Sequence, residues 1–251
     1  DDNHVKILFY YCNFTTFIFV MKGVYSIENC TGCDYECLKS EGISREDIDF
    51  LNESKREIMY SKGETIFKQG AYVSHIIFLK EGLVKLLVEG INNRNLIIKF
   101  ISSGQFIGFP ALEGDDFYPF TVKAVKKSAL CLIKKETISE LISRNHSLSR
   151  KINSWYGRDY RLLYTKLAII GTKNMHGRLA ETLLYLCQDE FANENIFEHI
   201  TRREMAEVAG MSVESMLKLL QELKADNIIE TKKKKIIIRD YEMLKRLSRI
   251  G

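Results

Sequence analysis

Three cysteines lie close together near the start of the chain, and a fourth follows about a hundred residues later. They are Cys30, Cys33 and Cys37 in the stretch CTGCDYECL, and Cys131 in SALCLIKKET. Four thiolates are a sufficient ligand set for an iron–sulfur cluster or a structural zinc ion. The same thiols can also form a redox switch, and Cys131, which lies in an apolar run, can be a small buried core residue. The cysteines alone leave these alternatives open.

The composition indicates a globular protein from a reducing compartment. The chain has 251 residues, of which 45% are hydrophobic and 28% charged, which suits one large or two ordinary domains. Six cysteines are far fewer than a secreted disulfide scaffold contains. The apolar stretch 7–20, about 14 residues long, is too short to span a bilayer. We therefore expect a cytoplasmic protein with no membrane partner, and we expect residues 1–20 to be a non-native or disordered leader that precedes the natural start at Met21.

The positive charge is concentrated at the end of the chain. Residues 201–251 contain 12 lysines and arginines against 8 aspartates and glutamates, whereas residues 1–200 contain 25 of each kind. The formal net charge of +4 therefore belongs to the last fifth of the sequence. A neutral body with a basic C-terminal domain indicates a polyanionic partner for that domain.

A β-rich domain is predicted over residues 57–143, after a cysteine-containing segment at 21–56. Short apolar runs alternate here with glycine-containing turns, and helical periodicity is lacking. The pattern predicts an antiparallel barrel or sandwich, an architecture typical of a sensor or binding module. The expected strands cover residues 75–80, 83–89, 96–101, 121–125 and 128–133.

A long helix is predicted over residues 144–172. Its apolar residues recur at alternating intervals of four and three, the spacing of a coiled-coil seam. This pattern favours a dimer helix, although a helix packed on its own domain is the alternative. The seam residues are Tyr156, Tyr160, Leu163, Leu167 and Ile170.

The segment 173–251 contains the signature of a winged helix-turn-helix. Thr201 and Glu204 form a capping-box pattern at the start of one helix, Gly210 marks a turn, and Ser212 caps a second helix. IIETKKKKIIIRD then predicts two strands joined by a lysine turn, which is the wing. The inward-facing positions are Met205, Ala206, Ala209, Met216, Leu219, Leu220 and Leu223.

This signature predicts a DNA-binding surface. A helix in the major groove presents its N-terminal residues to base edges, where Glu can accept from cytosine, Lys can donate to guanine and Val can contact a thymine methyl group. Basic residues at the first helix and at the wing tip are suited to phosphates. The expected DNA contacts are Arg202, Arg203, Ser212, Val213, Glu214, Ser215, Lys218, Lys233 and Lys234.

The order of these elements resembles the CRP/FNR superfamily of bacterial transcription regulators. KGETIFKQG, EGLVK and GQFIGF resemble its β-roll motifs, and ITRREMAEVAGMSVESMLKLLQELKADNIIE resembles its DNA-binding module. LKEGLVKLLVEG, YPFTVKA and MHGRLAETLLYL suggest a Bacteroidetes-type member. The resemblance implies an α+β fold with an N-terminal cyclic-nucleotide-binding-like jelly roll, a long dimerisation helix and a C-terminal winged helix-turn-helix. It also implies a homodimer that binds a palindromic promoter site, with RNA polymerase as a partner.

Departures from the family pattern bear on the effector. Phe109 and Tyr118–Pro119 stand where cyclic-AMP-binding members have a glutamate and an arginine–serine pair, so we do not expect cyclic AMP, because a buried phosphate would lack its counter-ion. Val213 and Lys218 likewise replace two family arginine positions in the recognition helix, so the usual half-site cannot be assumed.

The same resemblance assigns a role to the cysteines. The oxygen-sensing branch binds a [4Fe–4S] cluster through three N-terminal cysteines and one in a segment S-x-x-C-x-I-x-x-E-T, which SALCLIKKET matches. The spacing C-x2-C-x3-C is shorter than that branch's C-x2-C-x5-C. A response to oxygen, nitric oxide or redox state is thus implied. Haem is another option, with His75, His146, His176 and His199 as candidate ligands.

Two other functions stay open. One is a regulator without a metal site that is effector-free or responds to a small ligand. The other is a nucleotide-binding regulatory module of an enzyme or channel. No nucleophile–base pair, phosphate loop or metal–histidine motif occurs in the sequence, so we do not expect an enzyme.

Overall fold

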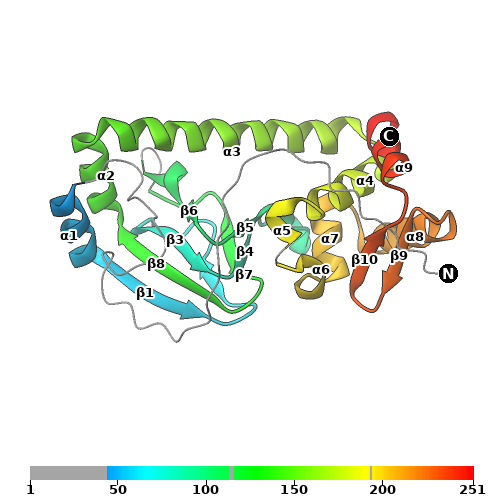
Figure 1. Cartoon of the computed structure of the whole chain (residues 1–251), viewed down its shortest axis with the longest axis horizontal. Helices are drawn as coiled ribbons and strands as arrows, with labels where there is room; N and C mark the ends of the chain where they lie inside the picture. Colours follow the sequence, from blue (N-terminus) through cyan, green and yellow to red (C-terminus); the bar gives the residue numbers. More distant parts are fainter. Residues whose placement is uncertain (1–43, 113–115, 193) are drawn as a thin grey trace, which may run out of the picture.

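A helix of 27 residues, α3 (His146–Thr172), runs along one side of both domains of the protein (Figure 1). The computed structural model describes residues 44–112, 116–192 and 194–251. A β domain lies under the N-terminal half of α3, and a mainly helical C-terminal domain lies under its other end. The α+β architecture expected from the sequence is confirmed.

Strands β1 to β8 form two four-stranded antiparallel sheets, in the orders β1-β8-β3-β6 and β2-β7-β4-β5. Apart from the hairpin of β4 and β5, strands that are neighbours in a sheet are not consecutive in the chain, as in a jelly roll. The five predicted strands are confirmed, at β3, β4, β5, β7 and β8. The bounds are β1 (Lys55–Tyr60), β2 (Thr65–Phe67), β3 (His75–Glu81), β4 (Leu83–Val88), β5 (Leu96–Ser102), β6 (Gln105–Ile107), β7 (Thr121–Ala124) and β8 (Ser128–Lys134).

Strands β3 and β8 are buried on both faces, which explains why their sequences are continuous apolar runs rather than alternating ones. One face looks into the jelly roll, where Ile77 and Leu130 belong to the core between the sheets. The other face is covered by helices α1 (Arg45–Ser54) and α2 (Lys135–Arg144). There Ile133 shares an apolar cluster with Leu51 and Leu141.

Helix α3 begins at an asparagine cap, because the Asn145 side chain accepts a hydrogen bond from the Leu148 amide at 3.0 Å. Leu148 and Ile152 bury the first turns of the helix against the β domain. At 1.5 Å per residue the helix is about 40 Å long. None of the helices in the described part of the chain has the length and apolarity that crossing a membrane requires.

The C-terminal domain packs its helices and a two-stranded hairpin around one apolar core. Its last helix, α9, lies against α4 so closely that a Cβ at Gly177 would be 2.7 Å from Gly251. Only glycine fits such an approach of two backbones. The elements are α4 (Met175–Leu186), α5 (Asp189–Ala192), α6 (Ile196–His199), α7 (Arg202–Ala209), α8 (Val213–Ala225), β9 (Ile229–Lys232), β10 (Lys235–Ile238) and α9 (Tyr241–Ile250).

Candidate nucleic-acid interface

Helices α7 and α8 form the predicted helix-turn-helix. Thr201 and Glu204 make the expected capping box: the Thr201 amide donates to the Glu204 carboxylate at 2.6 Å, and the Glu204 amide donates to the Thr201 hydroxyl at 3.1 Å. Gly210 ends α7 with a φ of 62°, a left-handed conformation that glycine adopts readily. Ser212 caps α8 by accepting from the Ser215 amide at 3.1 Å. All seven positions predicted to face inward are buried.

The start of α8 presents polar side chains to solvent. Glu214 and Lys218 are exposed, while Val213 and Ser215 are half-buried. Hydrogen bonds from its own backbone amide and from the Ser212 hydroxyl hold the pKa of Glu214 below its usual value. Glu214 is therefore ionised at neutral pH and can accept hydrogen bonds.

Strands β9 and β10 form the predicted hairpin, with Lys235 paired to Lys232 and a two-residue turn at Lys233 and Lys234. Both turn side chains are exposed. Lys233 has a φ of 52°, which is uncommon for a residue other than glycine. The wing thus carries its positive charge at its tip.

The two arginines at the start of α7 differ in their surroundings. Arg203 is exposed and pairs with Glu207 at 3.3 Å. Arg202 is half-buried beside Met205, and burial lowers the pKa of its guanidinium. The described structure therefore leaves Arg203 more accessible than Arg202.

Of the four candidate cluster ligands, only Cys131 lies within the described residues; Cys30, Cys33 and Cys37 lie outside them. Cys131 is buried in β8, opposite Phe78 of β3 and Glu57 of β1. Side chains alternate along a strand, so Cys131 shares a face of β8 with Ile133, the face near α1. In the described ranges, no three His, Cys, Asp or Glu side chains are grouped as a metal would require. A four-cysteine site thus depends on the N-terminal cysteines.

Aromatic side chains occupy the positions that differ from the cyclic-AMP-binding pattern. The Tyr118 ring stacks on Phe67 at 3.8 Å between the sheets, and its hydroxyl donates to the His75 carbonyl at 2.6 Å. Phe109 is buried and stacks on Trp155 of α3 at 5.3 Å.

The predicted seam of α3 is divided between two faces of the helix. Tyr160, Leu163 and Leu167 are exposed, by 58%, 39% and 68%. Tyr156 and Ile170 are half-buried and face their own chain: the Tyr156 hydroxyl donates to the Phe109 carbonyl, and Ile170 lies beside the Gly210 turn. Tyr164, which the predicted seam did not include, is 68% exposed. By helical spacing it lies on the same side of α3 as Tyr160, Leu163 and Leu167, and this side is called the outer face of α3.

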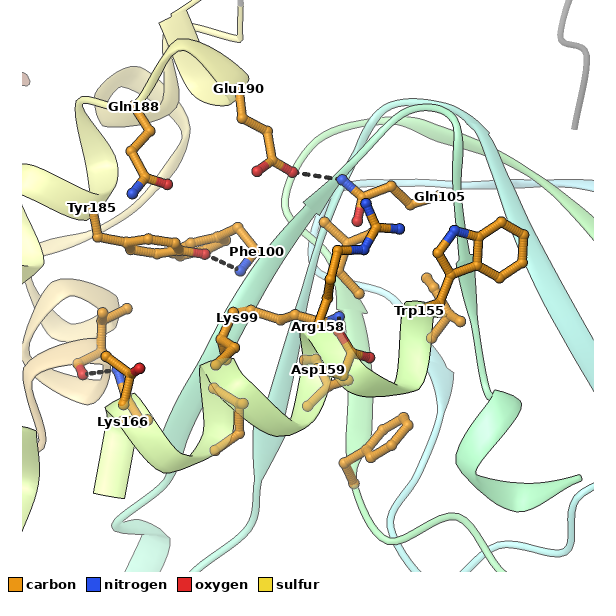
Figure 2. A pocket seen from close by; sticks show the side chains of 18 of the residues that line it. Lys99, Phe100, Gln105, Trp155, Arg158, Asp159, Lys166, Tyr185, Gln188 and Glu190 are labelled. Carbon is orange, nitrogen blue, oxygen red and sulfur yellow. Dashed lines mark hydrogen bonds and ion pairs between the residues drawn. The ribbon is translucent and has the colours of Figure 1, made fainter. Parts of the chain in front are cut away.

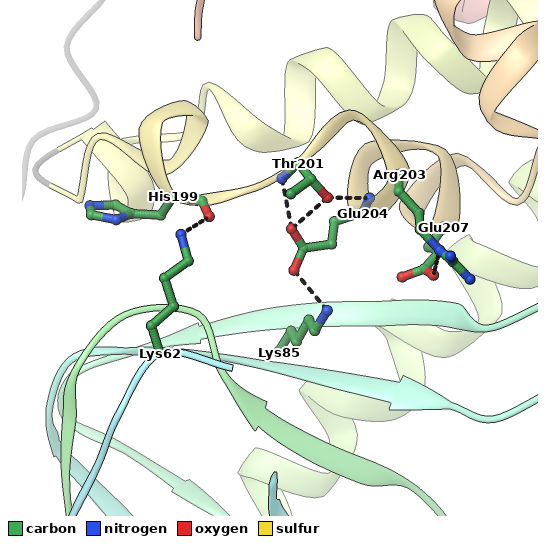
Figure 3. A network of polar contacts seen from close by, with 7 residues as sticks. All are labelled: Lys62, Lys85, His199, Thr201, Arg203, Glu204 and Glu207. Atoms are coloured by element: carbon green, nitrogen blue, oxygen red, sulfur yellow. Dashed lines mark hydrogen bonds and ion pairs between the residues drawn. The ribbon is translucent and has the colours of Figure 1, made fainter. Parts of the chain in front are cut away.

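A network of polar contacts joins the β domain to the helix-turn-helix (Figure 3). Lys85 of β4 donates to the Glu204 carboxylate at 2.7 Å, and Lys62 donates to the His199 carbonyl at 2.8 Å. Burial by itself raises the pKa of Glu204, but hydrogen bonds and charge from Lys85, together with the Thr201 donors, hold that pKa below its usual value. Around the network, apolar residues of β4 and β5 share one core with the C-terminal domain.

Comparison with known proteins agrees with this architecture. Residues 57–145 match the cyclic nucleotide-binding domain model, and residues 177–247 match the Crp-like helix-turn-helix domain model. The chain is 24% identical to the Yersinia pestis fumarate and nitrate reduction regulatory protein over 91% of this chain and 93% of the relative. It is also 24% identical to the Salmonella typhimurium cAMP-activated global transcriptional regulator CRP, over 71% of this chain and 87% of the relative.

Solved structures have the same fold. FixK2 from Bradyrhizobium japonicum aligns with a TM-score of 0.66 and 18% identity, over 78% of this chain and 98% of that one. A putative regulator of the crp/fnr family from Eubacterium rectale aligns with a TM-score of 0.69 and 16% identity, over 84% and 98%. A jelly roll, a long helix and a Crp-like helix-turn-helix, in this order and in relatives that are transcription regulators, show that the chain belongs to the CRP/FNR family of DNA-binding transcription regulators.

Proposed function

We propose that the protein acts as a homodimer that inserts one α8 from each protomer into a palindromic promoter site. The observation that carries this proposal is the exposed, charged start of α8 beside a basic wing. Two recognition helices about 34 Å apart would meet successive major grooves on one side of the duplex. RNA polymerase is the expected further partner, and the cytoplasm the expected compartment.

Each predicted DNA contact has a physical role in this proposal. Glu214 and Lys218 read base edges, with Val213 and Ser215 at the edge of the contact. Ser212 fixes the start of α8 through its cap, which orients these side chains. Arg202, Arg203, Lys233 and Lys234 contact phosphates and set the register without reading sequence.

The outer face of α3 supports the dimer proposal. Gly157, Tyr164 and Gly171 are seven residues apart, and Tyr160 and Leu167 fall between them at the matching seam positions. Among the described residues of one chain, a Cβ added to Gly157 or Gly171 would meet nothing within 4 Å. Glycine inside a helix costs about 1 kcal/mol of stability relative to alanine. Close packing of a second α3 against these two glycines would offset that cost.

The DNA proposal is tested by selecting bound duplexes from a random library. We expect a palindrome whose half-site centres lie about 10 base pairs apart. The Glu214→Ala variant should select a degenerate motif, whereas Lys234→Ala should select the wild-type motif with weaker binding. Failure of the wild-type protein to enrich any sequence would contradict the proposal.

For the effector, we propose oxygen, nitric oxide or redox state, with Cys30, Cys33, Cys37 and Cys131 as ligands of a [4Fe–4S] cluster. When bound, such a cluster would supply reactivity towards oxygen and nitric oxide and a redox-active centre. Cys131 is suitable because its strand face is the one that α1 covers. Cys37 precedes the α1 cap, Ser44, by seven residues, which is a reach of about 24 Å at most.

Anaerobic purification followed by measurement of iron, sulfide and the absorbance spectrum tests this ligand set. We expect about four irons per chain, loss of absorbance in air, and a colourless Cys131→Ala variant. Cys187→Ala is the matched control, because Cys187 is exposed at the end of α4. A wild-type protein purified without iron would overturn the cluster and favour the effector-free or small-ligand regulator.

A further inference from the structure

The four consecutive lysines of the wing fall into two pairs with different surroundings. Lys232 and Lys235 are directly opposite each other in the register of β9 and β10. Lys233 and Lys234 form the exposed turn, and no ion pair in the described part of the chain involves either of them. Like charges that are directly opposite each other destabilise a hairpin. Negative charge beside Lys232 and Lys235 would therefore stabilise the wing.

Each of the two opposed lysines has a carboxylate partner. Lys232 pairs with Glu230 of its own strand at 3.1 Å. Lys235 pairs with Glu198 of α6 at 2.8 Å. A hydrogen bond from Lys235, together with the charge of that lysine, holds the pKa of Glu198 below its usual value. Glu198 is therefore ionised at neutral pH and neutralises Lys235.

Glu198 differs from Glu230 because it lies outside the hairpin. It belongs to α6, which lies beside β10 (Figure 1). Ile196 and Ile200, at the two ends of this segment, are buried in the core that the C-terminal domain shares with strands of the β domain. The His199 carbonyl accepts a hydrogen bond from Lys62 of the β domain at 2.8 Å (Figure 3). Glu198 thus binds the wing from a firmly packed support.

These pairings give the lysines different access to DNA. A lysine that is paired with a carboxylate must leave it in order to bind a phosphate, and the unpaired carboxylate would then repel the DNA backbone. Lys233 and Lys234 bind phosphates without that cost. The lysines of the opposed pair instead hold the hairpin in place.

We propose that Glu198 is a positioning residue of the DNA interface, which holds the wing in place through Lys235. In this arrangement Lys233 and Lys234 contact phosphates, whereas Lys232 and Lys235 stay with their carboxylates. Phosphate contacts set the register of a protein on the duplex, so a wing held in one position favours the register in which α8 reads its site. The inference rests on the proposed function, but its phosphate contacts can be measured on DNA of any sequence.

The salt dependence of binding to a random-sequence duplex measures the number of phosphate contacts. Lys234→Gln should lower the salt slope by about 2 per dimer. The neutral-pair variant, Glu198→Gln with Lys235→Gln, removes both charges and should keep the wild-type slope. Glu198→Gln alone releases Lys235 to a phosphate and should raise the slope by about 2 per dimer. Glu242→Gln is the matched control, because it removes an exposed carboxylate that pairs with Lys245 on α9, and it should leave the slope unchanged.

The ratio of specific to non-specific DNA affinity tests the positioning role. The neutral-pair variant should lower this ratio about twofold to fivefold per protomer, as expected for the loss of one exposed ion pair. The exchanged pair, Glu198→Lys with Lys235→Glu, should restore the ratio. A general loss of structure would not be reversed by exchanging the two charges.

Each measurement has a result that would overturn the proposal. If the neutral-pair variant lowers the salt slope as much as Lys234→Gln does, Lys235 is itself a phosphate contact. If Glu198→Gln behaves like Glu242→Gln, or if the exchanged pair fails to restore the ratio, Glu198 does not position the wing. A wild-type protein that prefers no sequence would contradict the proposed function instead, and the salt slopes would still decide whether Glu198 keeps Lys235 from the phosphates.

Discussion

Lys85 of β4 and Glu204 in the first turn of α7 form an ion pair of 2.7 Å that links the β domain to the DNA-binding helices. Their side chains are only 13% and 16% exposed, so water screens the pair weakly. Glu204 also completes the capping box of α7. One carboxylate therefore both caps the first helix of the helix-turn-helix and holds that helix against the β domain.

Breaking this pair should reveal strong coupling between the two side chains. A double-mutant cycle with Lys85→Met and Glu204→Gln should give a coupling free energy of about 1–3 kcal/mol in urea unfolding at pH 7. Because the native pKa of Glu204 is depressed, this stabilisation is present above the unfolded-state pKa and lost as the pH falls through the native pKa. Additive effects within about 0.5 kcal/mol would show that the pair does not couple the domains.

The outer face of α3 should control the oligomeric state. Leu167→Glu places a charge at a residue that is 68% exposed in the single chain, so a dimer seam would have to bury that charge. Sedimentation should show a monomer. Tyr72→Glu changes a residue of the β domain that is 63% exposed, and this control should stay a dimer. If the Leu167→Glu variant sediments as a dimer, like the control, then the outer face of α3 is not the dimer interface.

The backbone of the wing turn is strained at one residue, and a glycine there should relieve the strain. Lys233 has a φ of 52°, which costs about 1–2 kcal/mol for a side chain with a Cβ. Lys233→Gly should therefore raise the unfolding free energy by up to about 1 kcal/mol, since glycine also loses more entropy on folding. Lys234, whose φ is not positive, gives the control: Lys234→Gly should lower the unfolding free energy. If Lys233→Gly and Lys234→Gly change the thermal unfolding temperature equally, the backbone at Lys233 is not strained.

Because of Lys166, the free energy of unfolding should change with pH in the alkaline range. Its native pKa is lowered to about 8 from a usual value of 10.5, because burial disfavours the charged form. Between these values the unfolded chain binds a proton that the native chain does not, so stability should rise with pH by up to about 3 kcal/mol. Lys166→Met should lose this rise. If the free energy of urea unfolding depends on pH in the same way for the wild-type protein and Lys166→Met, the lowered pKa of Lys166 is contradicted.

Local signals in the sequence predicted the DNA-binding half of the fold well. The capping box at Thr201 and Glu204 and the apolar spacing from Met216 to Leu223 depend only on neighbours along one helix. Strand β1 was not predicted, because most of Lys55–Tyr60 is exposed and its buried and exposed residues do not alternate. Strands β2 and β6 have three residues each, too few for a pattern.

Apolar spacing along α3 does not by itself tell which residues face their own chain. Tyr156 and Ile170 fit a heptad, yet Tyr156 bonds to Phe109 and Ile170 packs beside Gly210, contacts made across the fold. The outer face instead has glycines at 157 and 171, which give no hydrophobic signal. A cavity of about 700 Å³ between the β domain, α3 and α4 (Figure 2) could not be predicted either, since its walls come from segments that are distant in sequence.

The most direct test of the account is the ratio of specific to non-specific DNA affinity, measured for the wild-type protein, Glu214→Ala and Lys234→Ala over a range of salt. Glu214→Ala should reduce this ratio about tenfold or more with an unchanged salt slope, because it removes a base contact. Lys234→Ala should keep the ratio and lower the salt slope by about 2 per dimer, because it removes one phosphate contact from each wing. If Glu214→Ala keeps the wild-type ratio, α8 does not read the bases and the central claim fails.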